Sequence, residues 1–274
     1  MINALIDKAA QANAIAPGDY QKDGLWYCGK CNTPKQCVIE IDGVKRFPFC
    51  MCSCKKAKWL ETEERQKREQ QAARVNRLRE AGFEDGDMKR FTFAVDDGQN
   101  ERLTKTARRY VEHFADMLDS GKGLLLYGTV GTGKTFMAAC IANALIDKGY
   151  PCLVTNFTRV TNIINGMRDE RQKYLDSLNR YTLLVVDDLA TERDTDYMIE
   201  VVQSVIDARY RARKPLIITT NLTADELKRP ADIRKERLYS RLLEMCIPIQ
   251  VSGKDRRKAQ LRDDMKRYGE LLEL

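Results

Sequence analysis

The sequence predicts an α/β protein in which helices flank a five-stranded parallel sheet, preceded by a small cysteine-rich module. Three observations predict this organisation. From about residue 90 onward, five short and almost continuously apolar runs alternate with longer amphipathic stretches, which is typical of a parallel sheet buried on both faces. Six of the nine cysteines fall between residues 28 and 54. A very polar stretch of alternating charge separates the two parts.

Length and composition set the broad class. The 274 residues are enough for one or two domains with a sizeable core. No apolar run reaches the ~18 residues that span a bilayer, and the first helical stretch carries Asp7 and Lys8 where a signal peptide would be apolar. We therefore expect a cytoplasmic protein with no membrane partner. The net charge of +7 fits either ordinary solubility or a polyanionic partner such as nucleic acid.

Residues 1–56 are predicted to hold a short helix and a metal-binding module. Clustered cysteines in a cytosolic chain indicate a metal rather than disulfides. Zinc prefers four soft ligands in a tetrahedron, and the only histidine, His113, lies far along the chain. An iron–sulfur cluster is the alternative. The expected ligands of a structural Zn²⁺ are Cys28, Cys31, Cys52 and Cys54, with Cys50 as the alternative to one of the later pair.

Residues 57–82 are predicted to form a solvated helical linker, and residues 83–274 the α/β domain. Three lone cysteines in apolar segments, Cys140, Cys152 and Cys246, are expected in its core. A helix is expected over Thr135–Asp147, because Gly149 and Pro151 follow it. Thr223 to Glu226 has the form of a capping box at a helix start. The expected strands are Gly123–Tyr127, Cys152–Asn156, Thr182–Asp187, Pro215–Thr220 and Ile247–Val251.

A glycine-rich loop follows the first of these strands and opens a helix. It matches the pattern G-x-x-x-x-G-K-[ST] in full, in the strand-to-helix context that this motif requires. Its glycines let backbone N–H groups surround a phosphate, and the following helix adds its positive end. Lys134 is expected to reach the β- and γ-phosphates of ATP, and the Thr135 hydroxyl to bind Mg²⁺. The loop residues are Gly128, Thr129, Val130, Gly131, Thr132, Gly133, Lys134 and Thr135.

Polar side chains end the third and fourth of the expected strands. Four apolar residues lead into Asp187 and Asp188, and such a strand delivers a carboxylate to the metal. Asp187 is the expected Mg²⁺ partner, and Asp188 the expected general base or water-orienting residue. Asn221 follows the strand that ends at Thr220, where its amide is expected to position the attacking water. A strand-end Asn that caps a turn is the plainer alternative.

The order of motifs resembles the AAA+ replicative helicase loaders of the DnaC and DnaI type, which are grouped with IstB-like transposition helper ATPases. The resemblance covers roughly residues 80–260 and rests on Asp-Asp-Leu, Thr-Thr-Asn-Leu, Arg-Leu-Tyr-Ser-Arg-Leu and Ser-Gly-Lys-Asp-Arg-Arg. It implies that Arg241 is an arginine finger acting on a neighbouring subunit, with Arg237 as a second candidate one turn away. It also implies that Arg256 or Arg257 is a sensor 2 arginine. Self-association through the ATP sites follows from these roles.

The same resemblance implies partners. The N-terminal cysteine cluster looks like that of loaders from Gram-positive bacteria and their phages, so residues 1–56 are expected to dock onto a hexameric, DnaB-like replicative helicase. The compartment would be the cytoplasm of a bacterium, or of the host of a phage. A basic stretch is expected to contact single-stranded DNA without reading its sequence, although a solvated helix face explains it equally well. Its residues are Arg159, Arg168, Arg171 and Lys173.

Two departures from the family pattern concern hydrolysis and the lid. Many AAA+ ATPases carry Asp-Glu where this chain has Asp187-Asp188, which leaves the hydrolysis rate open. About 23 residues follow the last expected strand, which predicts little or no helical lid. A second basic run, Arg209 to Lys214, is expected at the surface.

The sequence therefore predicts an ATP-hydrolysing loader that places a replicative helicase on single-stranded DNA at replication initiation. An IstB-like transposition helper is the nearest alternative, and a weakly hydrolysing ATP-binding adaptor is the alternative from another class. A DnaA-like initiator is disfavoured, because no helix-turn-helix follows residue 251. A small-molecule kinase is disfavoured, because Asn221 and the two arginines would have no role.

Overall fold

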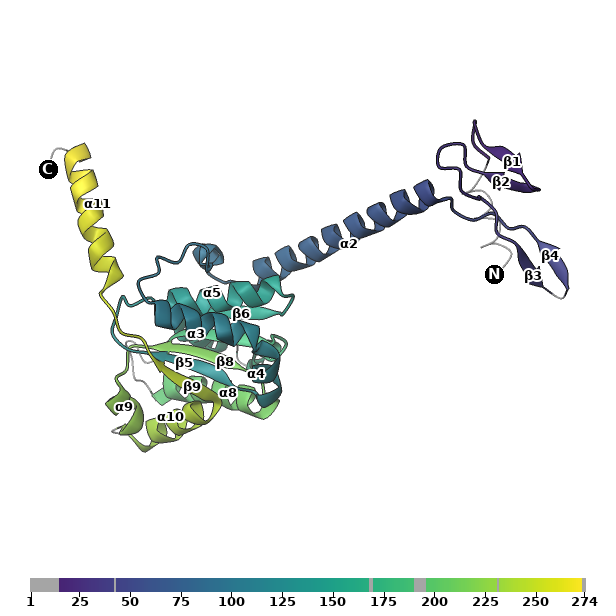
Figure 1. The fold of residues 1–274 in the computed structure, drawn as a ribbon. Coiled ribbons are helices and arrows are strands. Elements are labelled where there is room, and N and C mark those ends of the chain that lie inside the picture. The colour runs from purple at the N-terminus through teal and green to yellow at the C-terminus, as the bar shows by residue number, and fades with distance from the viewer. Residues whose placement is uncertain (1–14, 42, 168–169, 190–195, 231, 273–274) are drawn as a thin grey trace. The chain divides into compact units, whose positions relative to one another are not determined.

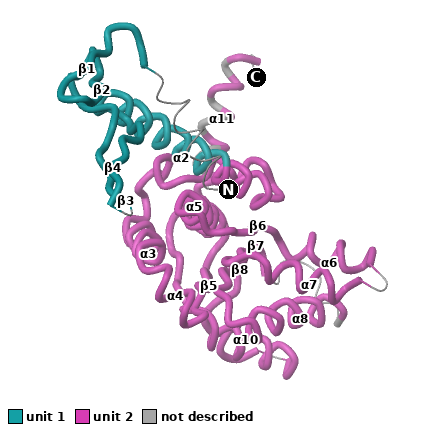
Figure 2. The backbone as a smooth tube through the Cα atoms, turned by 90° about the vertical axis from the view of Figure 1, so that its right-hand side faces the viewer, with its two compact units in different colours: residues 1–73 teal, residues 74–274 magenta. Residues whose placement is uncertain are grey.

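The protein forms two compact units, residues 1–73 and residues 74–274 (Figure 2). This computed structural model describes residues 15–41, 43–167, 170–189, 196–230 and 232–272. The boundary between the units falls inside a long helix, α2 (Ser53–Gly82), which includes the whole of the polar stretch 57–82. Its surface carries ion pairs between residues four apart, such as the pair of Lys67 with Glu63 at 2.8 Å.

The first unit contains two small antiparallel hairpins. Strand β1 (Tyr20–Lys22) pairs with β2 (Leu25–Tyr27), and β3 (Ile39–Ile41) pairs with β4 (Val44–Arg46). Among the described residues of this unit, Cys28 and Cys52 are the only apolar side chains that are buried. Hydrophobic burial therefore contributes little here, and so small a segment needs another source of stability.

The second unit is built on a five-stranded sheet in the order β6-β7-β8-β5-β9, and all of its strands are parallel. The order places β8 between β5 and β7, so the loops that follow these three strands leave the sheet side by side. This confirms the predicted parallel sheet. Its strands are β5 (Gly123–Tyr127), β6 (Cys152–Asn156), β7 (Leu183–Leu189), β8 (Leu216–Thr220) and β9 (Cys246–Gln250).

Helices cover both faces of the sheet, as Figure 1 shows for α3 and α5 on one side and α8 and α10 on the other. Alternate residues of each strand enter different cores: Leu124 packs with α3, α4 and α5, and Leu125 with α6, α7, α8 and α10. None of the helices in the described residues is long and apolar enough to cross a membrane. The helical elements are η1 (Gly86–Arg90), α3 (Glu101–Glu112), α4 (Phe114–Ser120), α5 (Lys134–Asp147), α6 (Phe157–Gly166), α7 (Arg171–Leu178), α8 (Asp196–Ala212), α9 (Ala224–Lys228), α10 (Ile233–Met245) and α11 (Arg256–Leu272).

Most local predictions in this unit are confirmed, and one is wrong. Cys140, Cys152 and Cys246 are buried, and the Thr223–Glu226 capping box is formed at the start of α9. The expectation of an entirely exposed basic run fails at Arg209, which is 1% exposed. The reason is helical spacing, because Arg209 continues the buried face of α8 that includes Val202 and Ile206.

Candidate nucleotide site and cysteine cluster

The glycine-rich loop joins β5 to α5, and all three of its glycines have positive φ angles. Gly128 and Gly131 have φ angles of +136° and +76°, which residues with a Cβ rarely adopt. A Cβ on Gly128 would lie 2.3 Å from the Val251 carbonyl oxygen, and one on Gly131 would lie 1.9 Å from a carboxylate oxygen of Asp255. The loop is therefore confined between β5 and the segment that follows β9.

Lys134, the first residue of α5, points back into this loop. Its Nζ donates to the carbonyl oxygens of Gly128 and Thr129, at 2.9 and 2.8 Å, and to Asn221 Oδ1 at 2.8 Å. Burial lowers the pKa of Lys134, an effect opposed by the nearby carboxylates of Asp188 and Asp187. A phosphate at this point would stabilise the ammonium form, so the arrangement fits a polyphosphate ligand.

Asp187 ends the apolar part of β7 and is 7% exposed. The Thr135 hydroxyl donates to its carboxylate at 2.8 Å from Oδ1 and 3.1 Å from Oδ2, and the Thr219 hydroxyl donates to Oδ1. Burial raises the pKa of Asp187, and these two hydrogen bonds oppose the rise. A buried carboxylate beside the P-loop hydroxyl is the donor set that Mg²⁺ takes with a nucleotide, so these residues fit that ion.

The segment after β9 covers the loop from the other side. The backbone N–H of Arg256 donates to the Gly131 carbonyl oxygen at 3.0 Å, and Arg256 Nη2 pairs with Asp97 Oδ1 at 3.2 Å. Arg256 Nη1 would lie 3.1 Å from a Cβ on Gly133. Of the two adjacent arginines considered for the sensor position, Arg256 is thus the one packed against the P-loop.

The four predicted cysteines of the first unit lie together. The sulfur atoms of Cys28, Cys31, Cys52 and Cys54 are all within 4.8 Å of one another. Two of these separations, Cys28–Cys54 at 3.7 Å and Cys52–Cys54 at 3.4 Å, are close to the spacing of about 3.8 Å that zinc–sulfur bonds of about 2.3 Å impose on a tetrahedron. The geometry fits a four-cysteine zinc site.

Local hydrogen bonds build the two turns that carry these cysteines. Asn32 N–H donates to the Cys28 carbonyl oxygen at 2.8 Å and closes the first turn. Ser53 N–H donates to Thr33 Oγ1 at 2.9 Å, which ties the start of α2 to that turn. A buried ion pair between Lys35 and Asp19 supports the same turn, since Asp19 also accepts from Gly29 N–H. The Ser53 contact therefore joins the two cysteine turns, and the Lys35–Asp19 pair stabilises the first of them.

The thiols of the cluster cannot all ionise without a cation. The Thr33 hydroxyl and nearby N–H groups lower the pKa of Cys31 to about 5. Hydrogen bonding with Cys52, and with the other thiols, raises the pKa of Cys54 to about 12. A bound divalent cation would stabilise all four thiolates at once. The alternative ligand Cys50 lies outside the cluster, with its Sγ 3.9 Å from the Pro34 carbonyl oxygen.

Comparison with known proteins identifies the family. The sequence model for "IstB-like ATP binding protein" matches residues 51–263, more than half of the chain. The chain belongs to this family.

Proteins similar to this chain in sequence include a helicase loader. The replicative helicase loader DnaI of Bacillus subtilis is 32% identical over 164 residues, which are 53% of this chain and 53% of DnaI. The match thus spans about half the length of that relative. The protein YqaM of the same species is 28% identical over 241 residues, which cover 82% of this chain and 75% of YqaM.

Solved structures place the second unit among AAA+ folds. The crystal structure of DnaI superposes with a TM-score of 0.52 and 21% identity, covering 62% of this chain and 96% of that one. At this identity the likeness concerns the fold. The predicted AAA+ architecture of the second unit is confirmed, and the first unit adds a four-cysteine cluster.

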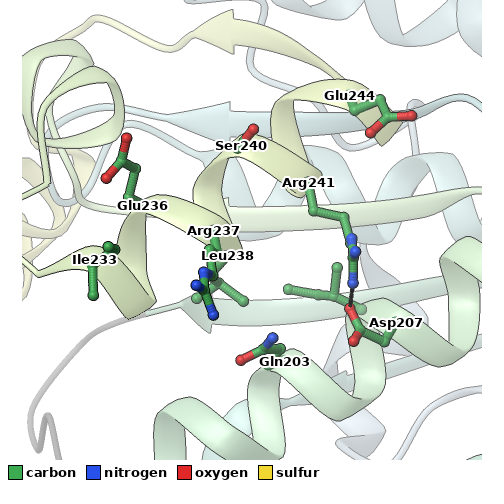
Figure 3. A pocket seen from close by; sticks show the side chains of 10 residues that line it. Gln203, Asp207, Ile233, Glu236, Arg237, Leu238, Ser240, Arg241 and Glu244 are labelled. Atoms are coloured by element: carbon green, nitrogen blue, oxygen red, sulfur yellow. Dashed lines mark hydrogen bonds and ion pairs between the residues drawn. The ribbon is translucent and has the colours of Figure 1, made fainter.

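The two candidate arginine fingers both lie on α10 but differ in their surroundings. Arg241 forms an ion pair with Asp207 of α8 (Figure 3). Its guanidinium also lies 5.1 Å from the centre of the Tyr210 ring. Both arginines line one cavity of about 700 Å³, where Arg237 is exposed and forms no ion pair with another described residue. Arg241 is therefore paired with Asp207, whereas Arg237 is exposed to solvent.

The three described basic residues that were predicted to contact DNA are paired with acids. Arg159 lies 3.1 Å from Glu84, Arg171 lies 2.9 Å from Glu200, and Lys173 lies 2.8 Å from Glu170. Arg168 lies outside the described residues. The three described cations sit on α6 and α7, and contact with phosphates would require them to exchange their carboxylate partners.

Two residues of the site escaped the sequence analysis. Thr219 touches Asp187 from the neighbouring strand, and Asp207 holds Arg241 from the neighbouring helix. Thr219 stands two residues before Asn221, so the alternation of strand side chains could have flagged it as facing the same site. Asp207 carries no such signal, because its partner lies 34 residues away.

Proposed function

We propose that this protein is an ATP-dependent loader that places a replicative helicase on single-stranded DNA at the start of replication. The observation that carries the proposal is the combination, in one chain, of an IstB-like ATP site with a four-cysteine module. The 32% identity to DnaI, which is itself named a replicative helicase loader, supports the same reading. It would act in the bacterial cytoplasm.

ATP binding would use the residues already gathered at the ends of β5, β7 and β8. The P-loop and Lys134 would hold the phosphates, and Thr135 with Asp187 would hold Mg²⁺. Asn221 and Asp188 stand where they could orient water, and Mg²⁺ would supply charge neutralisation on the phosphates. Hydrolysis by this site is part of the proposal.

The first unit would bind the helicase. With almost no apolar core of its own, it would depend on structural Zn²⁺ held by Cys28, Cys31, Cys52 and Cys54. A separate unit stabilised by zinc could recognise a partner protein while the second unit binds nucleotide and DNA. Subunits would meet through α10, with Arg241 or Arg237 reaching a neighbour's ATP. Arg159, Arg171 and Lys173, with Arg168, would contact the DNA backbone.

A transposition helper is the second candidate, because the family description itself is IstB-like. Such a helper would act in transposition and would not bind a helicase. The cysteine module favours the loader, since it adds a separate unit that ATP-dependent DNA binding alone does not require.

The test is transfer of the replicative helicase of the same source onto circular single-stranded DNA. Full-length protein, helicase, DNA and ATP are mixed, and DNA-bound helicase is measured by gel filtration. We expect wild type and the exposed-lysine control Lys228→Ala to raise bound helicase, and Lys134→Ala to fail. Cys28→Ser should fail earlier, at helicase binding without DNA.

The result against the loader is a wild-type protein that hydrolyses ATP with DNA yet never co-elutes with helicase. DNA-stimulated ATP hydrolysis without helicase binding would favour the transposition helper. Binding of ATP without turnover would instead favour an adaptor, which Asp188 in place of the usual glutamate keeps open.

A further inference from the structure

The hydroxyl of Thr219 lies between the two acidic residues of the nucleotide site. It donates to Asp187 Oδ1 and accepts the backbone N–H of Asp188 at 3.0 Å. Its single proton and an acceptor lone pair are therefore both used on the acid pair. Thr219 thus fixes the side chain of one acid and the backbone of the other.

The backbone around the acids explains why a side chain is needed here. The register of β7 and β8 pairs Val186 with Ile218 and Leu189 with Thr220, so Asp187 and Asp188 together oppose Thr219. Such a bulge leaves a backbone group without its strand partner. Asp188 also has a φ angle of +56°, which is unusual for a residue other than glycine. The Thr219 hydroxyl supplies the partner that the strand ladder does not.

Packing alone does not explain a hydroxyl at this position. Thr219 is fully buried, and its strand neighbours Ile217 and Ile218 are apolar and also β-branched. Valine has nearly the same shape and would fill the same space. Thr220, the next residue, is equally buried, but its hydroxyl bonds the Leu189 carbonyl oxygen and the Leu222 N–H, away from the two carboxylates. The two threonines therefore form a matched pair for comparison.

We propose that Thr219 is a positioning residue that sets the Asp187 carboxylate for Mg²⁺ and fixes the place of Asp188 beside it. This inference rests on the proposed ATP-binding function. Thr219 holds one side of the Asp187 carboxylate, and Thr135 of the P-loop contacts both of its oxygens. Preorganised ligands bind a metal without first having to be ordered, so loss of this hydroxyl weakens the metal site first.

The effect is confined to Mg²⁺ because the phosphate-binding contacts do not involve Thr219. Lys134 is held by Gly128, Thr129 and Asn221, and the loop backbone is fixed by its glycines and by Arg256. Nucleotide affinity measured without Mg²⁺ therefore stays the same when the hydroxyl is removed. The gain in affinity that Mg²⁺ brings is the quantity that falls.

The experiment titrates full-length protein with a fluorescent ATP analogue, once with Mg²⁺ and once with EDTA. In Thr219→Val, we expect the Mg²⁺-dependent gain in affinity to fall about tenfold, the size typical for loss of one hydrogen bond to a charged group. Thr219→Ser should restore it to within about twofold, since serine keeps the hydroxyl. Thr220→Val should keep the wild-type gain despite losing a buried hydroxyl of the same strand. The rate of ATP hydrolysis, where it is measured, should rank the variants in the same order as their Mg²⁺-dependent gain in affinity.

A wild-type gain in Thr219→Val would overturn the proposal, and so would equal losses in Thr219→Val and Thr220→Val. If Thr219→Val binds no analogue even in EDTA, it has lost the fold, and Thr219→Ala takes its place with the same expected loss. Failure of the proposed function looks different, because the wild type itself would then bind no nucleotide under either condition.

Discussion

At the scale of single residues, Arg209 has the most unusual environment of the second unit. Its guanidinium is buried and donates to the carbonyl oxygens of Tyr181, Thr182 and Pro215, with a weaker contact of 3.4 Å to Leu178. Burial lowers its pKa to about 10, so it remains charged at neutral pH. These carbonyls precede or begin β7 and β8, the strands that deliver Asp187 and Asn221. Arg209 therefore anchors the strand entries opposite the nucleotide site.

Replacing Arg209 should destabilise the second unit strongly. In Arg209→Met the carbonyls lose their donors inside the protein, and each unsatisfied group costs about 1–3 kcal/mol. We expect a loss of more than about 3 kcal/mol in the free energy of unfolding. Both tryptophans, Trp26 and Trp59, lie in residues 1–73, so the measurement is hydrogen exchange of β7 and β8 peptides across a urea series.

The control is Arg211→Ala, two residues along the same helix. Arg211 is exposed, and surface substitutions usually change stability by no more than about 0.5 kcal/mol. Equal midpoints for both variants would mean that the buried guanidinium contributes nothing beyond its volume.

The residue scale also marks where sequence reasoning reached its limit. The convergence of the P-loop, Asp187 and Asn221 could be predicted because each stands near the C-terminal end of a buried strand, in a pattern tied to phosphate and Mg²⁺ chemistry. The left-handed φ of Asp188 and the hydroxyl contact from Thr219 could not be predicted, because both depend on the register shift between β7 and β8. The predicted exposure of Arg209 was wrong for a simpler reason. It rested on the charge of the side chain, whereas the helical spacing of the residue places it on the buried face of α8.

At the scale of elements, the long buried runs were the reliable signal and the short strands were not. Strands β5 and β6 have the predicted bounds, since their apolar runs are bracketed by turns and helix signals. The three-residue strands β1 to β4 of the cysteine-rich module carry too few residues for periodicity to register. The cysteine spacing alone predicted that turn-based module.

Helix α10 yields a prediction about subunit contact, because it carries both candidate arginines. If Arg241 acts on a neighbour's ATP, it must leave Asp207, and Arg241→Ala should lower turnover by about 10³-fold or more, as loss of an arginine finger does. An equimolar mixture of Arg241→Ala and Lys134→Ala, each inactive alone, should recover turnover. In that mixture the second variant supplies Arg241 to the intact site of the first. ATPase rate against total protein concentration is the measurement.

The same mixing experiment with Arg237→Ala and Lys134→Ala decides between the two arginines. Only the variant that lacks the acting arginine should be inactive alone and regain turnover in the mixture. Asp207→Asn adds a further readout: freeing Arg241 should keep or raise turnover in the assembled protein. If Arg241→Ala and Asp207→Asn instead lower the thermal transition equally and no mixture recovers activity, the ion pair between α8 and α10 is structural.

At the scale of the whole molecule, the two units draw their stability from different sources. The second unit has two apolar cores, one on each face of its sheet. The described part of the first unit buries only two apolar side chains, both of them cysteines of the cluster. A structural zinc site contributes about 10–16 kcal/mol of apparent binding free energy, which is folding free energy for so small a segment. Removing the metal should therefore unfold one unit and spare the other.

Cysteine variants of the full chain put this asymmetry to the test. Cys28→Ser and Cys52→Ser should lose bound zinc, about one ion per chain in the wild type, as measured by elemental analysis. Cys37→Ser is the matched control, because Cys37 is exposed and outside the cluster. Cys50→Ser should also keep the zinc ion. Loss of zinc from this variant would mean that Cys50 is a ligand in place of Cys52 or Cys54.

Limited trypsin digestion then reports which unit has unfolded. Without zinc, cleavage should extend through the lysines and arginines of residues 15–73, while a fragment beginning near residue 74 persists and still binds nucleotide. Digestion should be slower before α2 in wild type and Cys37→Ser, because the turns carrying the cysteines are closed. Loss of nucleotide binding together with zinc would contradict the separation, since it would mean that the fold of the second unit depends on the cysteine cluster.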